Sequence, residues 1–200
     1  MRVKRLLRHP VTWGVLAVGA VALGVALYLF QPWRLFTTVE VNEALPVAAS
    51  PGPEAARQGE PGDASKASKA SKAADASKAA EPAQEPKTLA TGTFISHEHE
   101  TEGRARVLEL PDGSRVLRIE DLNTSDGPDL RVWLSDQPVK KGNAGWFNLD
   151  DGEHLELGEL KGNRGNANYA IPAGTDLGDL KSVTIWCRRF GVSFGAAALT

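Results

Sequence analysis

A run of twenty uncharged residues, Val11–Phe30, restricts the fold of this chain more than any other feature. At a rise of about 1.5 Å per residue, a helix of this length is roughly 30 Å long, the thickness of the hydrocarbon core of a bilayer. Trp13, Tyr28 and Trp33 lie near its two ends, and aromatic side chains favour the membrane–water interface. The run predicts one transmembrane helix over residues 11–30.

The charges beside this run predict its orientation. Residues 1–10 carry four basic side chains and no acidic one, which predicts a cytoplasmic N-terminal segment and an extracytoplasmic remainder. A cleaved signal peptide is the alternative, but its apolar core is shorter and small residues follow it. Here the run ends in the bulky sequence Leu-Phe-Gln-Pro-Trp. We therefore expect an uncleaved signal-anchor that crosses the cell membrane once.

Residues 31–88 are predicted to form an extracytoplasmic linker. From residue 41 onward Ala, Ser, Pro, Glu and Lys dominate, and an Ala-Ser-Lys motif repeats within residues 64–80. A segment with so few large apolar side chains cannot bury enough surface to offset the entropy lost on ordering. We expect a disordered tether that holds a folded domain away from the membrane.

Residues 89–200 are predicted to form one all-β domain. Short segments rich in β-branched and apolar residues alternate with turn sequences such as Pro-Asp-Gly, and no long helical period appears. This pattern is typical of an antiparallel β-sandwich, here of about eight strands. The expected strands are Gly92–His97, Ala105–Leu110, Arg115–Leu122, Leu130–Leu134, His154–Leu160, Ala167–Ile171, Val183–Cys187 and Val192–Leu199.

The charge and cysteine content of this domain exclude several classes of function. It carries seventeen acidic and twelve basic residues, whereas nucleic-acid binding needs a basic face. The single cysteine of the chain excludes an internal disulfide and a Cys-x-x-Cys site. No serine lies in a nucleophile-elbow motif, so the sequence does not favour a hydrolase.

Cys187 is the strongest candidate for redox chemistry. A reactive cysteine needs a partly exposed, positively charged setting, and two arginines follow it directly. If the strand continued, Arg189 would lie on the face of Cys187 and would lower the pKa of its thiol. The alternative is a structural cysteine, because Val183 and Ile185 precede it at a period of two and predict a buried face. Trp186 and Arg189 are candidates for contact with a bound group, although the sequence identifies no cofactor.

Three histidines are candidates for a metal site. His97 and His99 would point to the same side of a strand, and His154 would complete a set if the fold brought it near. The alternative is a solvated polar edge, because glutamates alternate with these histidines at positions 98, 100 and 102. The spacing favours the polar edge over the metal site.

Residues 91–200 resemble the DM13 domain family, and residues 29–46 resemble the membrane-anchored bacterial members of that family. The resemblance covers roughly the C-terminal half of the chain and depends on the order and spacing of several short motifs. These motifs are Thr91–Phe94, Gly127–Leu130, Val132–Ser135, Leu157–Gly162, Ile185–Cys187 and Phe194–Gly195.

The resemblance implies an electron-transfer role, with Cys187 at the position of the family's cysteine. It predicts a membrane-anchored redox accessory of the cell envelope that uses this single thiol. The alternative is a non-catalytic binding or adhesion module, with exposed aromatic side chains as anchors and a wall polymer or another envelope protein as partner. Both hypotheses place the domain at the membrane, and neither involves nucleic acid.

Overall fold

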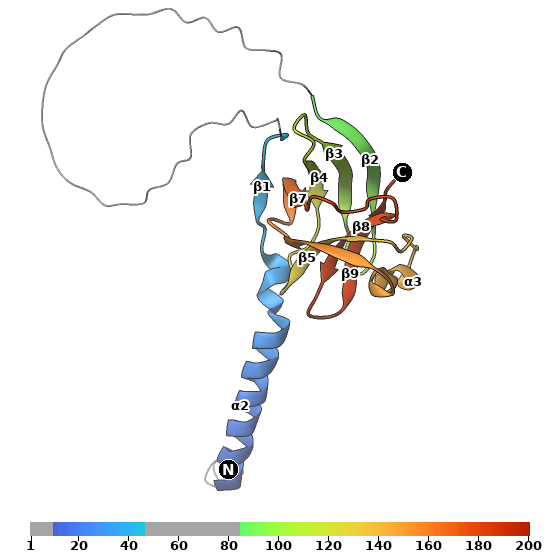
Figure 1. The fold of residues 1–200 in the computed structure, drawn as a ribbon. Coiled ribbons are helices and arrows are strands. Elements are labelled where there is room, and N and C mark those ends of the chain that lie inside the picture. Colours follow the sequence, from blue (N-terminus) through green and yellow to red (C-terminus); the bar gives the residue numbers. More distant parts are fainter. Residues whose placement is uncertain (1–9, 47–84) are drawn as a thin grey trace, which may run out of the picture.

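A computed structural model describes residues 10–46 and 85–200 of the chain (Figure 1). Most of the predicted cytoplasmic segment, residues 1–9, and the low-complexity part of the predicted linker, residues 47–84, lie outside the described residues. The described elements, in chain order, are α2 (Pro10–Phe30), η1 (Pro32–Phe36), β1 (Glu40–Asn42), β2 (Lys87–Ser96), β3 (Glu102–Glu109), β4 (Arg115–Asn123), β5 (Leu130–Ser135), α3 (Asn143–Trp146), η2 (Asn148–Asp150), β6 (His154–Glu159), β7 (Arg164–Ile171), β8 (Ser182–Cys187) and β9 (Val192–Ala198).

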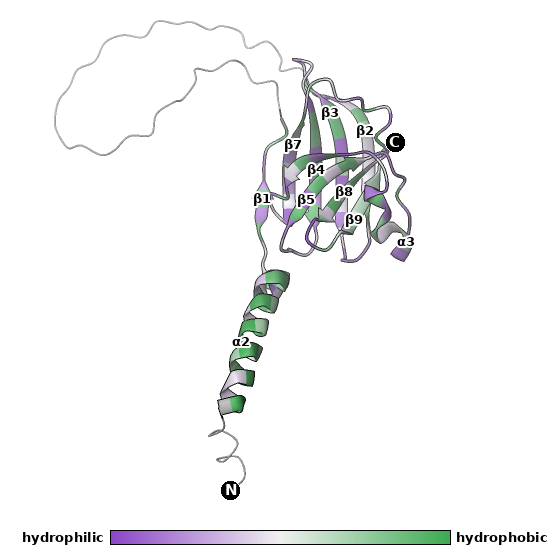
Figure 2. Cartoon of the chain, turned by 60° about the horizontal axis from the view of Figure 1, so that its bottom comes forward, coloured by the Kyte–Doolittle hydropathy of each residue, from purple (hydrophilic) through white to green (hydrophobic). Residues whose placement is uncertain are grey.

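α2 extends away from the domain as a single exposed helix (Figure 1). In the part of the chain that the structure describes, it is the one helix long and apolar enough to cross a membrane, over Val11–Phe30. Figure 2 shows that the helix is predominantly apolar along its whole length, whereas apolar and polar residues alternate along the strands. A helix that is apolar all round, with most of its large side chains exposed, needs an apolar environment. The helix predicted over residues 11–30 is confirmed, with the length and composition of a membrane span.

The strands form one mixed sheet in the order β1-β7-β4-β3-β2-β9-β8-β5-β6. The eight strands predicted after residue 89 correspond to β2–β9, and these pair only in the antiparallel sense. β1, which lies inside the predicted linker, pairs with β7 in parallel. The prediction of a purely antiparallel fold is therefore wrong, because a ninth strand from the N-terminal side joins the sheet edge.

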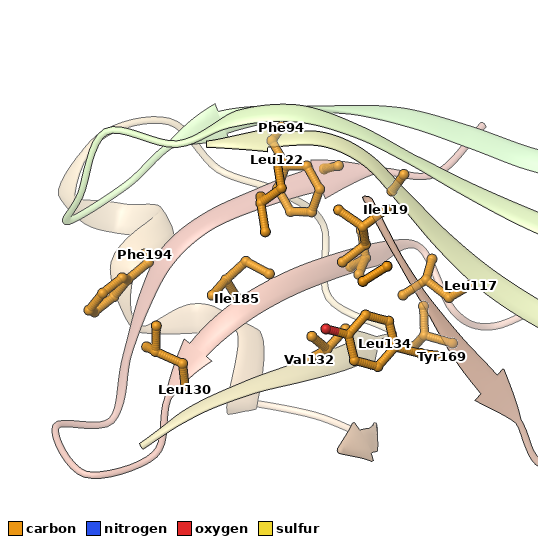
Figure 3. Packing of buried hydrophobic residues seen from close by; sticks show 14 of the residues in the cluster. Phe94, Leu117, Ile119, Leu122, Leu130, Val132, Leu134, Tyr169, Ile185 and Phe194 are labelled. Atoms are coloured by element: carbon orange, nitrogen blue, oxygen red, sulfur yellow. The ribbon is translucent and has the colours of Figure 1, made fainter. Parts of the chain in front are cut away.

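The sheet curls because β2 changes partners along its length. Its first part pairs with β3, and its last three residues, Phe94–Ser96, pair with β9. Side chains from the two halves of the sheet meet in the main core, as Leu117 and Ile119 from β4 and Ile185 from β8 show in Figure 3. The result is one curled sheet that resembles half a barrel. The two separate sheets of the predicted sandwich are not confirmed.

β8 is buried on both of its faces. Val183, Ile185 and Cys187 face the main core, as their alternation predicts. Trp186 points to the opposite face, where it belongs to a second cluster with Trp133, Leu149 and Ala196. Leu149 comes from η2, so the connection between β5 and β6 covers this outer face. The sequence does not predict this cover, because its two helical turns are too short to show a helical period.

Replacing Trp186 tests the importance of the second cluster. Trp186 is only 2% exposed, so Trp186→Ala should lower the free energy of unfolding by about 3–5 kcal/mol. Chemical denaturation of the full chain in detergent measures this difference. Trp33→Ala is the matched control, because Trp33 is 53% exposed and its loss should cost less than about 0.5 kcal/mol. Equal effects of the two substitutions would contradict the assigned packing.

β1 and the residue before it pair closely with the edge of the domain's sheet. The backbone N–H of Val39 donates to Oδ1 of Asn163 at 2.7 Å, and the carbonyl oxygen of Val39 accepts from the N–H of Arg164 at 3.2 Å. Gly165 has a φ of 98°, and a Cβ on it would collide with the carbonyl oxygen of Val41. Glycine is therefore required at position 165 both by the backbone conformation and by the close approach of β1.

Charged groups fix the segment that follows β1. Nζ of Lys161 lies 2.7 Å from Oε1 of Glu43, and the N–H of Asn168 donates to Oε2 at 2.7 Å. The Lys161 ammonium and this N–H hold the pKa of Glu43 below its ordinary value, although partial burial opposes the shift. Nη1 of Arg118, a side chain that is 6% exposed, donates to the carbonyl oxygens of Glu43 at 2.7 Å and Ala44 at 3.2 Å. Without these carbonyls a buried guanidinium would lose hydrogen bonds, which is costly.

Part of the predicted linker, residues 31–88, forms elements that pack on the domain. Residues 32–46 and 85–88, which fall inside the predicted range 31–88, include η1, β1 and the start of β2. β1 precedes the low-complexity residues 47–84 and pairs with β7, and β2 follows them and pairs with β3. The connection between α2 and the domain is therefore the short η1–β1 segment.

Cleavage inside residues 47–84 should leave the two fragments of the chain associated. After insertion of a specific protease site between Ala64 and Ser65, we expect the C-terminal fragment to stay on the membrane-bound N-terminal fragment, because β1 remains paired with β7. Sedimentation of proteoliposomes after cleavage measures retention. Glu43→Ala should weaken the association about tenfold by removing charge-assisted hydrogen bonds. Glu40→Ala is the matched control, since Glu40 bonds only Asn42 within β1. Complete release of the C-terminal fragment from the proteoliposomes after cleavage would contradict the conclusion that β1 holds the two fragments together.

Candidate functional site

Cys187 is the last residue of β8 and lies at the end of the main core. It pairs with Leu130 of β5 and Val192 of β9, and its side chain is fully buried among core residues. It is a free thiol. The chain turns directly after it, because the N–H of Gly191 donates to the Cys187 carbonyl oxygen at 2.8 Å and Gly191 has a φ of 61°. The thiol is therefore covered on one side by the turn Arg188–Gly191, which we call the β8–β9 turn.

Burial raises the pKa of the Cys187 thiol above its ordinary value of 9.0. The negative charge of Glu98 acts in the same direction. Backbone N–H groups of Phe190, Arg189 and Asp129 favour the thiolate and partly oppose the shift. In this structure Cys187 is therefore a neutral thiol, which is neither a good nucleophile nor a good metal ligand.

Arg189 does not lie on the face of Cys187. The alternation of a strand would place it there, but β8 ends at Cys187 and the β8–β9 turn redirects the backbone. Arg189 is exposed, and its Nη1 donates to the carbonyl oxygen of Leu29 at 3.4 Å. Its charge thus lies at the C-terminal end of α2, where it complements the helix dipole. The expected lowering of the thiol pKa by this arginine is wrong for this reason.

His97 is buried and makes two hydrogen bonds. Its Nε2 lies 3.0 Å from the carbonyl oxygen of Lys140, and its Nδ1 lies 2.8 Å from Oγ of Ser193. A carbonyl oxygen only accepts, so Nε2 carries the proton and Nδ1 accepts from the serine hydroxyl. Burial lowers the pKa of His97 below its ordinary value of 6.5, and the bond to the Lys140 carbonyl only partly opposes this shift. Both ring nitrogens are occupied by structural bonds.

The domain should lose stability in mild acid because of His97. The unfolded histidine gains a proton as the pH falls below about 6.5, whereas the buried one stays neutral until a lower pH. The contribution of neutral, buried His97 to the free energy of unfolding is therefore fully present above about pH 6.5. It is lost as the pH falls through the lowered pKa of the folded state. Thermal unfolding between pH 7.5 and 5 should show a falling melting temperature.

His97→Gln should reduce this pH dependence, because glutamine does not titrate in the same range. His154→Gln is the control, since His154 is exposed. An identical pH slope for His97→Gln and the unchanged protein would contradict the assignment of His97 as the titrating group.

The three histidines do not form a metal site. Nε2 of His99 lies 3.0 Å from Oε2 of Glu98, and the His99 ring packs at a tilt against Phe194 with 3.9 Å between ring centroids. His154 stacks instead on Trp133 at 4.2 Å, as part of the row His154–Trp133–Trp186. No group of three His, Cys, Asp or Glu side chains within residues 10–46 and 85–200 is arranged to hold a metal ion. Trp186 itself lies on the face of β8 opposite to Cys187, so it does not line the surroundings of the thiol.

The C-terminal end of α2 is fixed to the domain through side chains. Phe30 stacks on Phe190 of the β8–β9 turn with 5.5 Å between ring centroids. Nη1 of Arg34, in η1, lies 3.4 Å from Oδ1 of Asp126 and donates to the carbonyl oxygen of Gly127 at 3.1 Å. Together with the Arg189 contact, these interactions hold the helix end against the same turn that covers Cys187.

A cavity of about 270 Å³ lies where the helix end meets the domain. α2 and η1 contribute Phe30, Pro32, Arg34 and Leu35, while the domain contributes Glu98, His99, Asp126, Pro128, Phe190 and Phe194. The lining is mostly apolar and aromatic, with a few polar groups, as is typical of small-molecule sites. Sequence reasoning does not find this site, because it depends on packing between segments about 65–160 residues apart in the chain.

The comparison with known proteins identifies the family. A family model described as "Electron transfer DM13" matches residues 93–199, more than half of the chain. No curated protein and no solved structure matches the chain. The matched range runs from β2 to the end of β9 and includes Cys187. The chain therefore belongs to the electron-transfer DM13 family.

Proposed function

We propose that this protein is a membrane-anchored electron-transfer accessory of the cell envelope and that Cys187 is its redox residue. α2 anchors the chain, the N-terminus is cytoplasmic, and the domain lies on the extracytoplasmic side. The observation that supports this proposal best is the position of Cys187 directly under the β8–β9 turn that contacts α2. The only thiol of the chain thus lies at the membrane-proximal end of the domain, next to a turn whose movement would expose it.

The reaction proposed for Cys187 is exchange with a disulfide of another envelope protein. The thiol first loses its proton to solvent, and the thiolate then attacks one sulfur of the partner's disulfide. A bond forms between Cys187 and that sulfur, while the second sulfur leaves as a thiolate. Cys187 is oxidised and the leaving sulfur is reduced, so the electrons balance. Because Cys187 is fully buried, this step requires local opening of the β8–β9 turn.

A second candidate function is a non-catalytic binding module of the envelope. The observation that favours it is the complete burial of Cys187 together with the raised pKa of its thiol, which is typical of a structural cysteine. In that case the exposed aromatic side chains near the membrane, such as Phe36 and Trp33, would contact a wall polymer or another envelope protein. The two functions differ in whether the folded protein ever exposes its thiol.

The rate of Cys187 modification in low denaturant distinguishes the two functions. If the turn opens locally, the folded full chain should react with a maleimide at a rate that hardly changes with denaturant concentration. Phe190→Ala should raise that rate about twofold to tenfold, because it removes an aromatic contact that holds the turn against α2. The rate is measured by mass spectrometry of quenched samples.

Phe147→Ala is the matched control, because Phe147 is also exposed but lies at α3, away from this turn. It should leave the modification rate unchanged. If the rate of Cys187 modification rises with denaturant concentration as steeply as global unfolding does, the thiol reacts only in the unfolded chain and Cys187 is a structural residue. That outcome would overturn the redox proposal and favour the binding module.

A further inference from the structure

The cavity at the end of α2 lies at the level where a membrane helix leaves the bilayer. Phe30 is the last residue of the candidate membrane span, and it lines the cavity together with Gln31 and Pro32. The exposed aromatic residues Trp33 and Phe36 follow in η1, as is typical of the membrane–water interface. With α2 in a bilayer, the cavity is therefore open to molecules that move in the membrane plane.

The size and shape of the lining favour one flat ring. The volume of about 270 Å³ lies just below the range of roughly 300–1,000 Å³ that holds drug-sized ligands. Phe190 and Phe194 contribute aromatic rings, and Leu35 and Pro128 add apolar surface. Aromatic side chains stack favourably on planar ligands. A single substituted ring with a hydrocarbon tail left in the membrane would fit these dimensions.

The charges of the lining favour an uncharged ligand. Asp126 is paired with Arg34 and accepts the N–H of Gly127 at 2.8 Å, and Glu98 is paired with His99. Arg34 is the arginine of the described lining, and its Nη1 is bonded to Asp126 and to the Gly127 carbonyl oxygen. Both carboxylates have partners as well, which leaves neither of them unpaired for the ammonium of a lipid headgroup. Transfer of a neutral ring from water into the cavity would therefore cost less desolvation free energy than transfer of a charged group.

The lining also offers a hydrogen-bonding group for a ring oxygen. Nε2 of His99 faces Glu98, whereas its Nδ1 makes no hydrogen bond to any residue in the described ranges. The side chain is partly exposed, and its ring is held in place by Phe194. Because the Glu98 carboxylate only accepts, Nε2 carries the proton and Nδ1 is an acceptor, so this histidine can accept a hydrogen bond from a ring hydroxyl of a ligand.

We infer that this cavity binds the ring of a membrane-borne quinone or quinol. This ligand class is neutral, planar and two-oxygenated, and its isoprenoid tail stays in the bilayer. The inference rests on the proposed function, because such a molecule carries electrons in the plane of the membrane in which α2 would anchor this electron-transfer domain. Glu98 connects the two sites, since it lines the cavity and its charge acts on the Cys187 thiol.

Photolabelling of the full chain in phosphatidylcholine nanodiscs tests the inference. The probe is the reduced quinol form of an azido-ubiquinone with a short tail, and the competitor is decyl-ubiquinol. We expect saturable labelling of peptides that contain residues 30–35 or 188–194, with competition by decyl-ubiquinol. His99→Leu should weaken binding about tenfold by removing the acceptor for a ring hydroxyl. Leu35→Trp should abolish binding by filling the cavity from an exposed position outside the core.

His154→Leu is the matched control, because this histidine stacks on Trp133 and does not line the cavity. It should bind the probe like the unchanged protein. Labelling that rises without saturation, or equal labelling of His99→Leu and His154→Leu, would overturn the inference. Displacement of the probe by phosphatidylethanolamine would also overturn it, because the cavity would then be a phospholipid headgroup site.

Two measurements on the unchanged chain separate this inference from the proposed function: labelling by the quinol probe and maleimide modification of the Cys187 thiol. They can fail independently, because Cys187 does not line the cavity. Failure of quinone binding together with local exposure of the Cys187 thiol would refute the quinone site alone. Quinone binding without any exposure of the thiol would refute the redox role of Cys187 alone.

Discussion

The parallel pairing of β1 with β7 determines where the domain lies relative to α2. It is three residue pairs long, but polar contacts on both sides extend it, from the Val39 backbone to Glu43 and Ala44. The buried Arg118 guanidinium needs the two carbonyls that this segment supplies, so the domain is completed by the chain that leads out of the helix. As a consequence, η1 is short and the β8–β9 turn is brought onto the end of α2 (Figure 1).

β8 carries the candidate redox residue, Cys187, and lies next to the turn that contacts α2. One face of β8 places Cys187 in the main core, and the other places Trp186 against Trp133. Because both faces are buried, the thiol has no route to solvent along the strand and is separated from the helix end by the β8–β9 turn. The same turn contacts the end of α2 through Phe190 and Arg189. Glu98 and Phe194 extend the same region to the cavity.

The features set by local sequence periods were predictable. The eight strands of the domain, the apolar helix and the burial of one face of Val183–Cys187 follow from hydrophobic patterning, which depends on near neighbours. β1 was not predictable from the sequence, because Glu-Val-Asn is too short and too polar to show a strand period. Its segment is held by hydrogen bonds to residues more than 100 positions away. Alternation would place Arg189 on the face of Cys187 only if the strand continued, whereas β8 ends at Cys187 and the β8–β9 turn redirects the backbone. The cavity and the pairing of Asp126 with Arg34 depend on contacts between distant segments, for which a single sequence gives no signal.

The end of α2 is held against the β8–β9 turn by Phe190 and Arg189. A disulfide cross-link tests it most directly, with Phe30→Cys and Phe190→Cys introduced together in a Cys187→Ser chain so that no other thiol is present. The ring centroids of Phe30 and Phe190 are 5.5 Å apart, so mild oxidation of the membrane-embedded protein should cross-link this pair rapidly and at low protein density. The control pair Phe30→Cys and Phe147→Cys should cross-link far more slowly. Equal, slow rates for the two pairs would contradict the account, because they would mean that the domain moves freely on its anchor.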